Sequence, residues 1–190
     1  MTFDPFTQYD RRTLVASDPV EIDAPAAIVW EILTDLPRYG EWNPYCVRAE
    51  STLEMGAPVN MMLVDYTGSG SLIPWCEYLC AFEPERLLSW ELPGTPEFPY
   101  EARRDQVITP LGPYRCRYQS TDAFFGENAI HVMNFTQGWV KRAFDDTARA
   151  LKRRAEAMHQ ARTTVARLKS GPPRDGSRAR SAPSGLRCLG

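Results

Sequence analysis

The first fifty residues change from one hydrophobic periodicity to another, and the change predicts their secondary structure. Val20 and Ile22 alternate with acidic neighbours, which predicts a half-buried strand over about residues 13–23. Spacings of three and four then predict a short amphipathic helix, whose apolar positions are Ile28, Val29, Ile32, Leu33 and Leu36. Pro37 ends this helix, and a second helix of one turn is expected to close at Gly40.

Six further strands are predicted from the alternation and from the turn residues between them. They cover about residues 45–50, 59–66, 72–82, 86–92, 101–109 and 114–121. No helical pattern interrupts this series, so neighbouring strands are expected to pair one after another. The order therefore predicts an antiparallel meander and not an α/β crossover sheet.

The last predicted element is a long amphipathic helix over about residues 137–168, roughly 45 Å long at about 1.5 Å per residue. An apolar stripe of that length needs a curved sheet to cover it. We expect one domain over residues 13–168, preceded by a poorly ordered arm at residues 1–12. Residues 169–190 contain turn-forming and charged residues and predict a disordered basic tail, whose removal after Ser170 should leave the melting temperature unchanged.

Several motifs resemble, in the same order, those of the SRPBCC or START-like superfamily, and within it the polyketide cyclase/dehydrase-like branch. The matching positions are Ile22, Ala24, Pro25, Val29, Trp30, Leu33, Thr34, Asp35, Tyr39, Glu41, Trp42, Asn43 and Pro44, then residues 83–90, 109–112, 122–126 and 138–158. The resemblance covers about residues 13–165. It implies an α+β helix-grip fold: a curved antiparallel sheet of about seven strands around a long C-terminal helix, with two short helices between the first two strands.

Composition narrows the function classes. The formal net charge of −2 and the pI near 5.8 argue against a nucleic-acid-binding protein. Residues 141–190 nevertheless contain 13 basic and four acidic residues, which indicates a solvated helix face with a basic tail, or attraction to an anionic surface.

Sequence length and residue types set further expectations about location and cofactors. No apolar run approaches the roughly 18 residues of a membrane span, and the N-terminus lacks a signal-peptide pattern, so a cytoplasmic protein without a membrane span is expected. With only two histidines, we expect no metal site, and we expect no cofactor. A monomer or a homodimer is equally compatible with the sequence.

A sheet that closes over one helix leaves a pocket, and aromatic side chains are the expected lining. The ligand-binding candidates are Tyr66, Trp75, Tyr78, Trp90, Gln106, Phe135 and Trp139. Ordinary core packing is the alternative for each aromatic residue, although buried tyrosine and tryptophan need partners for their polar ends. His131 and Asn134 precede the predicted long helix and are expected at a cap or on the surface.

The strand at residues 101–109 brings an arginine inward whichever face is buried. Glu101, Arg103 and Asp105 share one face, while Arg104 and Gln106 share the other. The second face is less charged, and the resemblance also places it inside, although relatives often have a histidine near Arg104. We therefore expect Arg104 in the cavity, paired with Glu77, Asp122 or an anionic ligand, and Arg103 in water.

The predicted function is the binding of a mid-sized hydrophobic ligand with a polar or anionic group. The resemblance implies a possible further step, the cyclisation or dehydration of a polyketide-like or aromatic substrate. Arg104 would then hold an oxyanion, and Tyr118 or Asp122 would transfer a proton. The alternatives are a non-catalytic lipid or steroid carrier and a co-chaperone-like module that binds a protein partner.

Overall fold

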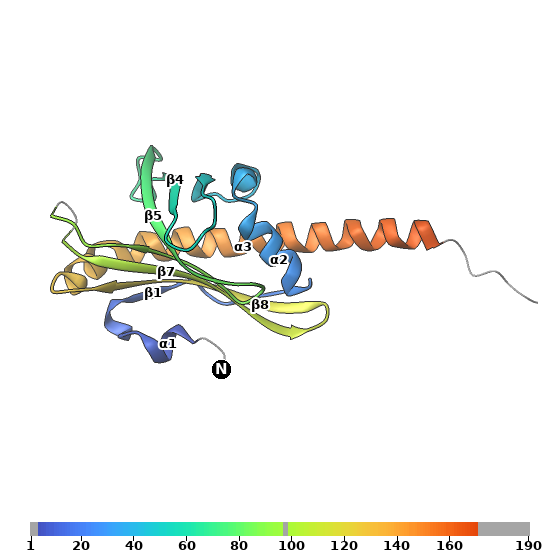
Figure 1. The fold of residues 1–190 in the computed structure, drawn as a ribbon, viewed down its shortest axis with the longest axis horizontal. Helices are drawn as coiled ribbons and strands as arrows, with labels where there is room; N and C mark the ends of the chain where they lie inside the picture. The colour runs from blue at the N-terminus through green and yellow to red at the C-terminus, as the bar shows by residue number, and fades with distance from the viewer. Residues whose placement is uncertain (1–3, 97–98, 171–190) are drawn as a thin grey trace, which may run out of the picture.

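The computed structural model describes residues 4–96 and 99–170, and its element order follows the predicted one (Figure 1). The N-terminal elements are α1 (Pro5–Gln8), η1 (Arg11–Thr13), β1 (Leu14–Ala16), β2 (Val20–Ile22), α2 (Ala26–Thr34) and η2 (Leu36–Glu41). They are followed by β3 (Cys46–Glu50), β4 (Pro58–Val64), β5 (Leu72–Glu83), β6 (Leu87–Leu92), β7 (Glu101–Gly112), β8 (Arg115–Phe125) and α3 (Ala129–Ser170).

Within the described residues the strands form one antiparallel sheet of eight strands, in the order β1-β8-β7-β6-β5-β4-β3, with β2 also paired to β8. This confirms the predicted meander. The single strand expected at 13–23 is divided into β1 and β2. The division falls where the amide of Asp18 donates to the Asp145 carboxylate of α3 (2.7 Å) and where Pro19 has no amide to pair.

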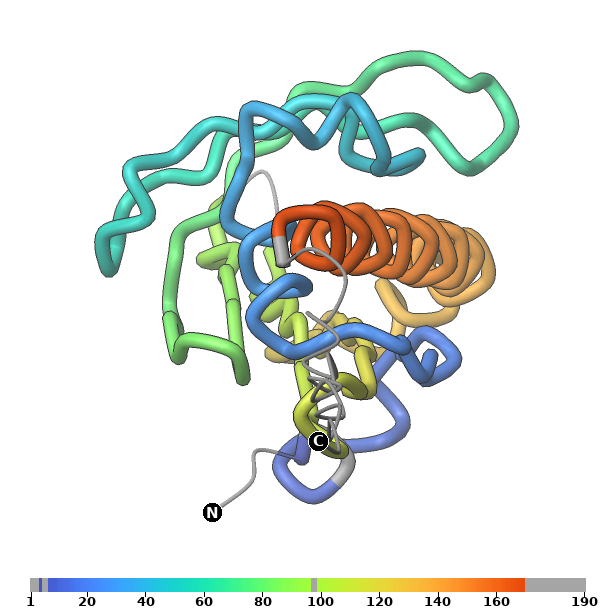
Figure 2. Tube along the Cα trace, turned by 90° about the vertical axis from the view of Figure 1, so that its right-hand side faces the viewer, coloured from blue at the N-terminus to red at the C-terminus, as the bar shows by residue number. Residues whose placement is uncertain are grey.

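The sheet curves around α3, which confirms the helix-grip fold (Figure 2). The helix places a continuous stripe of small and large apolar side chains against the sheet: Val140, Ala143, Phe144, Ala148, Leu151 and Ala155. Its far end extends beyond the sheet (Figure 1). Among the described residues, no helix has the length and apolar character needed to span a membrane.

The long helix begins at Ala129, eight residues before the predicted start. Gly126 ends β8 with a positive φ of 84°, and the amide of Ala129 bonds to its carbonyl (3.2 Å). Residues 129–136 contain β-branched, aromatic and amide side chains, so their local preference for helix is weak. Packing over the open end of the sheet stabilises these first turns.

The two short helices close the opposite end of the sheet. The hydroxyl of Tyr39 in η2 donates to the carbonyl of Leu33 in α2 (2.7 Å), which fixes the angle between them. The Asn43 side chain then accepts bonds from the amides of Tyr45 and Cys46 and starts β3. The helical pattern of α2 also predicts a buried Trp30, and this prediction is wrong: Trp30 is only half-buried, because it packs edge-on against Phe82 (centroids 4.9 Å apart) at the margin of the core.

The N-terminal arm is more regular than predicted over the part that the structure describes. It forms α1 and η1, and the Tyr9 hydroxyl donates to Asp105 on the outer face of β7 (2.9 Å). Asp105 is fully buried and also accepts bonds from Ser89 and Arg103 (2.5 and 3.0 Å). These local contacts offset the cost of ordering the arm. Residues 1–3 and 171–190, including nearly all of the predicted tail, lie outside the described residues.

Candidate functional site: a cavity with a buried ion cluster

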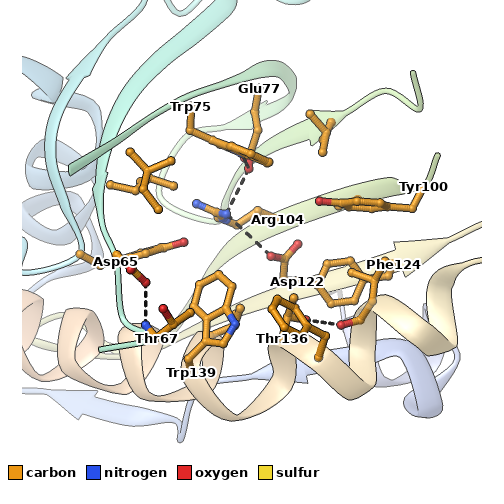
Figure 3. A pocket seen from close by; sticks show the side chains of 18 of the residues that line it. Asp65, Thr67, Trp75, Glu77, Tyr100, Arg104, Asp122, Phe124, Thr136 and Trp139 are labelled. Carbon is orange, nitrogen blue, oxygen red and sulfur yellow. Dashed lines mark hydrogen bonds and ion pairs between the residues drawn. The ribbon is translucent and has the colours of Figure 1, made fainter. Parts of the chain in front are cut away.

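A cavity of about 660 Å³ lies between the inner face of the sheet and the first turns of α3 (Figure 3). Its wall is mostly apolar and aromatic, with contributions from Trp75, Leu92, Tyr100, Phe124 and Trp139. The volume suits a small organic molecule of a few rings. The charged side chains of the wall are few, and three of them lie on β5, β7 and β8.

Glu77 of β5, Arg104 of β7 and Asp122 of β8 form a buried ion cluster in the cavity wall (Figure 3). Nη2 of Arg104 lies 3.1 Å from Oε1 of Glu77 and 3.7 Å from Oδ2 of Asp122. The side chains of these three residues are 11 %, 5 % and 8 % exposed, in the order Arg104, Glu77 and Asp122. All three project inward because of strand alternation, and Arg104 and Asp122 are direct partners in the β7–β8 register.

Two aromatic rings contact the guanidinium, one from α3 and one from the residue before β3. The Cζ atom of Arg104 lies 5.7 Å from the ring centre of Tyr45 and 5.4 Å from that of Phe144. Each distance suits a cation–π contact. The position of Arg104 is therefore fixed by two carboxylates and two rings, and its side chain is not free to swing into the cavity.

The cluster has one permanent cation and two carboxyl groups whose pKa values are raised. Burial, together with the charge of nearby Glu77, raises the pKa of Asp122 to about 7 against the attraction of Arg104. Burial likewise raises the pKa of Glu77, although Arg104 and the Trp75 indole N–H (2.8 Å) lower it. Burial alone would lower the pKa of Arg104, but the charge of Glu77 leads the contributions that raise it overall, so Arg104 stays cationic. Asp122 can therefore gain or lose a proton near neutral pH.

Five of the ten predicted site residues line this cavity, namely Trp75, Arg104, Asp122, Phe135 and Trp139. Arg104 faces inward as the alternation predicted. Arg103 lies on the outer face as predicted, but the expectation that it lies in water is wrong. It donates to the buried Asp105 (3.0 Å), and its side chain is only 28 % exposed. His131 lines the cavity, although the sequence favoured a cap or a surface position over one at the cavity mouth.

Tyr118, Gln106 and Trp90 lie elsewhere, around a separate cavity of about 30 Å³ that shares Tyr45 and Arg104 with the larger one. Tyr118 is fully buried, and its hydroxyl donates to Oε1 of Gln106 (3.3 Å). Burial raises its pKa above the usual value. Gln106 and Tyr118 lie further along β7 and β8 than Arg104, so Tyr118 does not reach a ligand in the larger cavity. Trp90 is the direct partner of Arg104 in the β6–β7 register and borders only the smaller cavity.

Tyr66 and Tyr78 also lie outside the cavity wall. Tyr78 points to the opposite face of β5 and is 40 % exposed, because Trp75 and Glu77 use the alternate inward positions. Tyr66 lies edge-on to Tyr45 (centroids 5.6 Å apart), and its hydroxyl donates to Asp146 of α3 (3.3 Å).

Many of the wall residues were not among the predicted site residues, and Tyr45, Asp65 and Tyr100 are three of them with polar side-chain atoms. Tyr45 directly precedes β3, and its amide donates to the side chain of Asn43, which was named only among the positions of the family resemblance. Asp65 follows the last residue of β4, where the sequence predicted a strand continuing to residue 66. Tyr100 precedes β7 by one residue, in a loop with no periodicity.

Comparison with known proteins places the chain in a family. The family described as "Polyketide cyclase / dehydrase and lipid transport" matches residues 13–156, so the chain belongs to it. No curated protein matches the chain at a significant level. The suspected relationship to the polyketide cyclase-like branch is thus confirmed, and the family includes both enzymes and transport proteins by its description.

Solved structures show the same fold at low sequence identity. The Zhui aromatase/cyclase from Streptomyces sp. R1128 is 18 % identical, with a TM-score of 0.56 over 80 % of this chain and 96 % of that one. A norcoclaurine synthase from Thalictrum flavum is 12 % identical, with a TM-score of 0.57 over 76 % and 94 %. Protein TTHA0849 from Thermus thermophilus is 16 % identical, with a TM-score of 0.57 over 76 % and 98 %. At these identities the likeness shows the fold alone.

Proposed function

We propose that the cavity binds a hydrophobic molecule of a few rings and that the polar group of this ligand meets the Glu77–Arg104–Asp122 cluster. The observation that carries the proposal is the position of this cluster, almost fully buried in the wall of a mostly apolar cavity. A purely structural core would be stabilised at least as well by apolar side chains of similar volume, because burying ions is costly. Interaction with a polar group of the ligand explains why charged side chains are present in the cavity wall.

We further propose that the cluster supports a cyclisation or dehydration reaction of a polyketide-like or aromatic substrate. The Asp122 carboxylate removes a proton from the carbon beside a ligand carbonyl, and the Arg104 cation stabilises the enolate oxygen that results. Protonated Asp122 then donates that proton to a hydroxyl on the next carbon. The C–O bond breaks, water leaves, and a carbon–carbon double bond forms, so Asp122 returns to its starting state.

A synthetic β-hydroxyketone tests this reaction. The probe is 4-hydroxy-4-(2-naphthyl)butan-2-one, whose dehydration gives a conjugated enone that is followed by ultraviolet absorbance. We expect the protein to accelerate the reaction and Asp122→Asn to lower the rate by at least about tenfold, since acid–base groups typically contribute about 10²–10⁴-fold. Asp23→Asn is the matched control, because Asp23 is 80 % exposed and lies outside the cavity wall. An equal rate in Asp122→Asn would contradict the role of Asp122.

A carrier of a hydrophobic molecule is the second candidate, favoured by the apolar character of most of the cavity wall. The family description also includes lipid transport. The same probe separates the two functions. Binding of the hydroxyketone without dehydration would support the carrier and remove the catalytic proposal.

The raised pKa of Asp122 also predicts how stability depends on pH. Its pKa rises from the ordinary value of 3.8 to about 7, so the folded protein holds this proton more tightly than the unfolded chain. The free energy of unfolding should therefore decrease as pH rises from about 4 to about 7. Asp122→Asn cannot lose the proton, and we expect it to be more stable than wild type by roughly 1–3 kcal/mol at about pH 8.

Urea denaturation at about pH 5 and about pH 8 measures this difference. The advantage of Asp122→Asn should shrink at about pH 5, where wild-type Asp122 is largely protonated. A variant that is less stable than wild type at both pH values would show that the Asp122 charge stabilises the fold.

A further inference from the structure

The charges of the cavity wall are mostly negative, despite the inward-facing arginine. Asp65, Glu77 and Asp122 provide three carboxyl groups against the single guanidinium of Arg104. Asp65, at the end of β4, accepts bonds from the Thr67 amide (2.7 Å) and from the Ser69 hydroxyl, which lower its pKa to about 2. It is therefore ionised at any physiological pH. His131 is the only other titratable basic side chain of the wall among the described residues.

The cationic charge of Arg104 is already neutralised. A single nitrogen, Nη2, faces both Glu77 and Asp122 within 4 Å. A ligand carboxylate placed beside this guanidinium would be a third anion around one cation, in a buried environment where like charges repel strongly. The anionic ligand considered from the sequence is thus the ligand that the cluster accommodates least well.

The residues of the cavity wall instead include a buried acceptor and two buried donors without partners. Oε2 of Glu77, Nε1 of Trp139 and Nε of Arg104 are shielded from solvent, and none of them has a hydrogen-bond partner among the described residues. All three residues line the cavity. Buried polar atoms that lack partners are unfavourable, so a ligand that satisfies them gains affinity.

We infer that the natural ligand presents an uncharged hydrogen-bond donor, a hydroxyl above all, to the carboxylates of Glu77 and Asp122, and not a carboxylate or phosphate to Arg104. This inference rests on the proposed binding function and specifies its ligand class. A carbonyl elsewhere on the ligand would accept from Nε of Arg104 or from Nε1 of Trp139. A hydroxylated aromatic or polyketide-like compound has both groups.

Three probes with the same ring test the inference: 2-naphthol, 2-methoxynaphthalene and 2-naphthoate. The first donates a hydrogen bond, the second only accepts one, and the third is an anion. Isothermal titration calorimetry of the full chain at about pH 8 gives the three dissociation constants. We expect 2-naphthol to bind about tenfold more tightly than 2-methoxynaphthalene, and 2-naphthoate to bind about tenfold more weakly than the ether.

A variant shows whether the discrimination originates in the cluster. In Asp122→Asn the wall has one negative charge fewer, so 2-naphthoate should bind about tenfold more tightly than it binds wild type. Asp23→Asn, outside the cavity wall, should leave all three dissociation constants unchanged. If Asp122→Asn does not fold, the order of the three probes on the wild-type protein still decides the inference.

The outcomes separate the ligand class from the binding function itself. If 2-naphthoate binds most tightly, or if 2-naphthol and its methyl ether bind equally, the donor inference is wrong while the cavity remains a binding site. If none of the three probes binds, the proposed function fails together with the inference.

Discussion

Replacing Arg104 with glutamine is expected to lower the free energy of unfolding by about 3–5 kcal/mol at about pH 8, because two buried carboxylates lose their shared cation. Glutamine is similar in length but carries no charge to compensate Glu77 and Asp122. The loss should shrink at about pH 5, since both carboxyl groups have raised pKa values and take up protons as the pH falls. Urea denaturation at the two pH values measures both effects.

Arg103→Gln is the matched control for Arg104→Gln. Its partner Asp105 keeps hydrogen bonds from Ser89 and Tyr9, and the Arg103 side chain is partly exposed. We therefore expect a smaller loss for Arg103→Gln than for Arg104→Gln. Equal losses for the two variants, or an Arg104→Gln loss that does not change with pH, would contradict the ion cluster as the dominant electrostatic feature of the cavity.

Phe144→Ala should be comparably destabilising, by about 3–5 kcal/mol, because it removes a large side chain from the centre of the contact between α3 and the sheet. Phe144 is 2 % exposed and also packs against the ring of Tyr45 and the guanidinium of Arg104. Chemical denaturation measures the change. Phe135→Ala is the control on the same helix: Phe135 is 77 % exposed, and its loss should cost less than about 0.5 kcal/mol.

A loss below about 1 kcal/mol for Phe144→Ala would mean that the long helix does not pack on the sheet as the structure shows. A large loss for Phe135→Ala would show that the first turns of α3 are covered in solution. Either result would require a different arrangement of the cavity wall.

Strand alternation explains why the sequence predicted the facing of Arg103 and Arg104 correctly. Successive side chains point to opposite faces, so the charge of the neighbouring residues identifies the buried face of β7. The same rule excludes Tyr78 from the cavity, because it lies three residues from Trp75 and cannot share its face. Tyr78 was nevertheless predicted as a ligand-binding residue, because the segment is rich in aromatic residues and strand alternation was not applied to it.

Alternation does not indicate how far along a strand the cavity reaches. Arg104 and Gln106 point inward alike, yet Gln106 and its partner Tyr118 lie beside the smaller cavity. The extent of the cavity along the strands depends on where α3 crosses the sheet, and this crossing is set by the tertiary structure. The early start of α3 at Ala129 escaped prediction for a related reason, since packing on the sheet stabilises turns that local propensity does not.

The sequence also could not assign the net charge of the site. Glu77 and Asp122 were named as alternative partners of Arg104, and the structure brings both to the same guanidinium nitrogen. Glu77 and Asp122 lie 27 and 18 positions from Arg104 along the chain. They meet it only because β5, β7 and β8 lie near one another in the curved sheet. The sequence allowed a polar or an anionic ligand group, and this convergence leads us to infer an uncharged hydrogen-bond donor.

Native mass spectrometry after incubation with an extract of small hydrophobic molecules tests the central claim most directly. Ala102 lines the cavity and is 8 % exposed, so Ala102→Phe would fill part of the space without changing a charge. We predict a one-to-one complex between the wild-type protein and a small molecule, and a strong reduction of that complex in folded Ala102→Phe. Equal occupancy of wild type and Ala102→Phe, or no bound molecule on the wild-type protein, would contradict the cavity as the binding site.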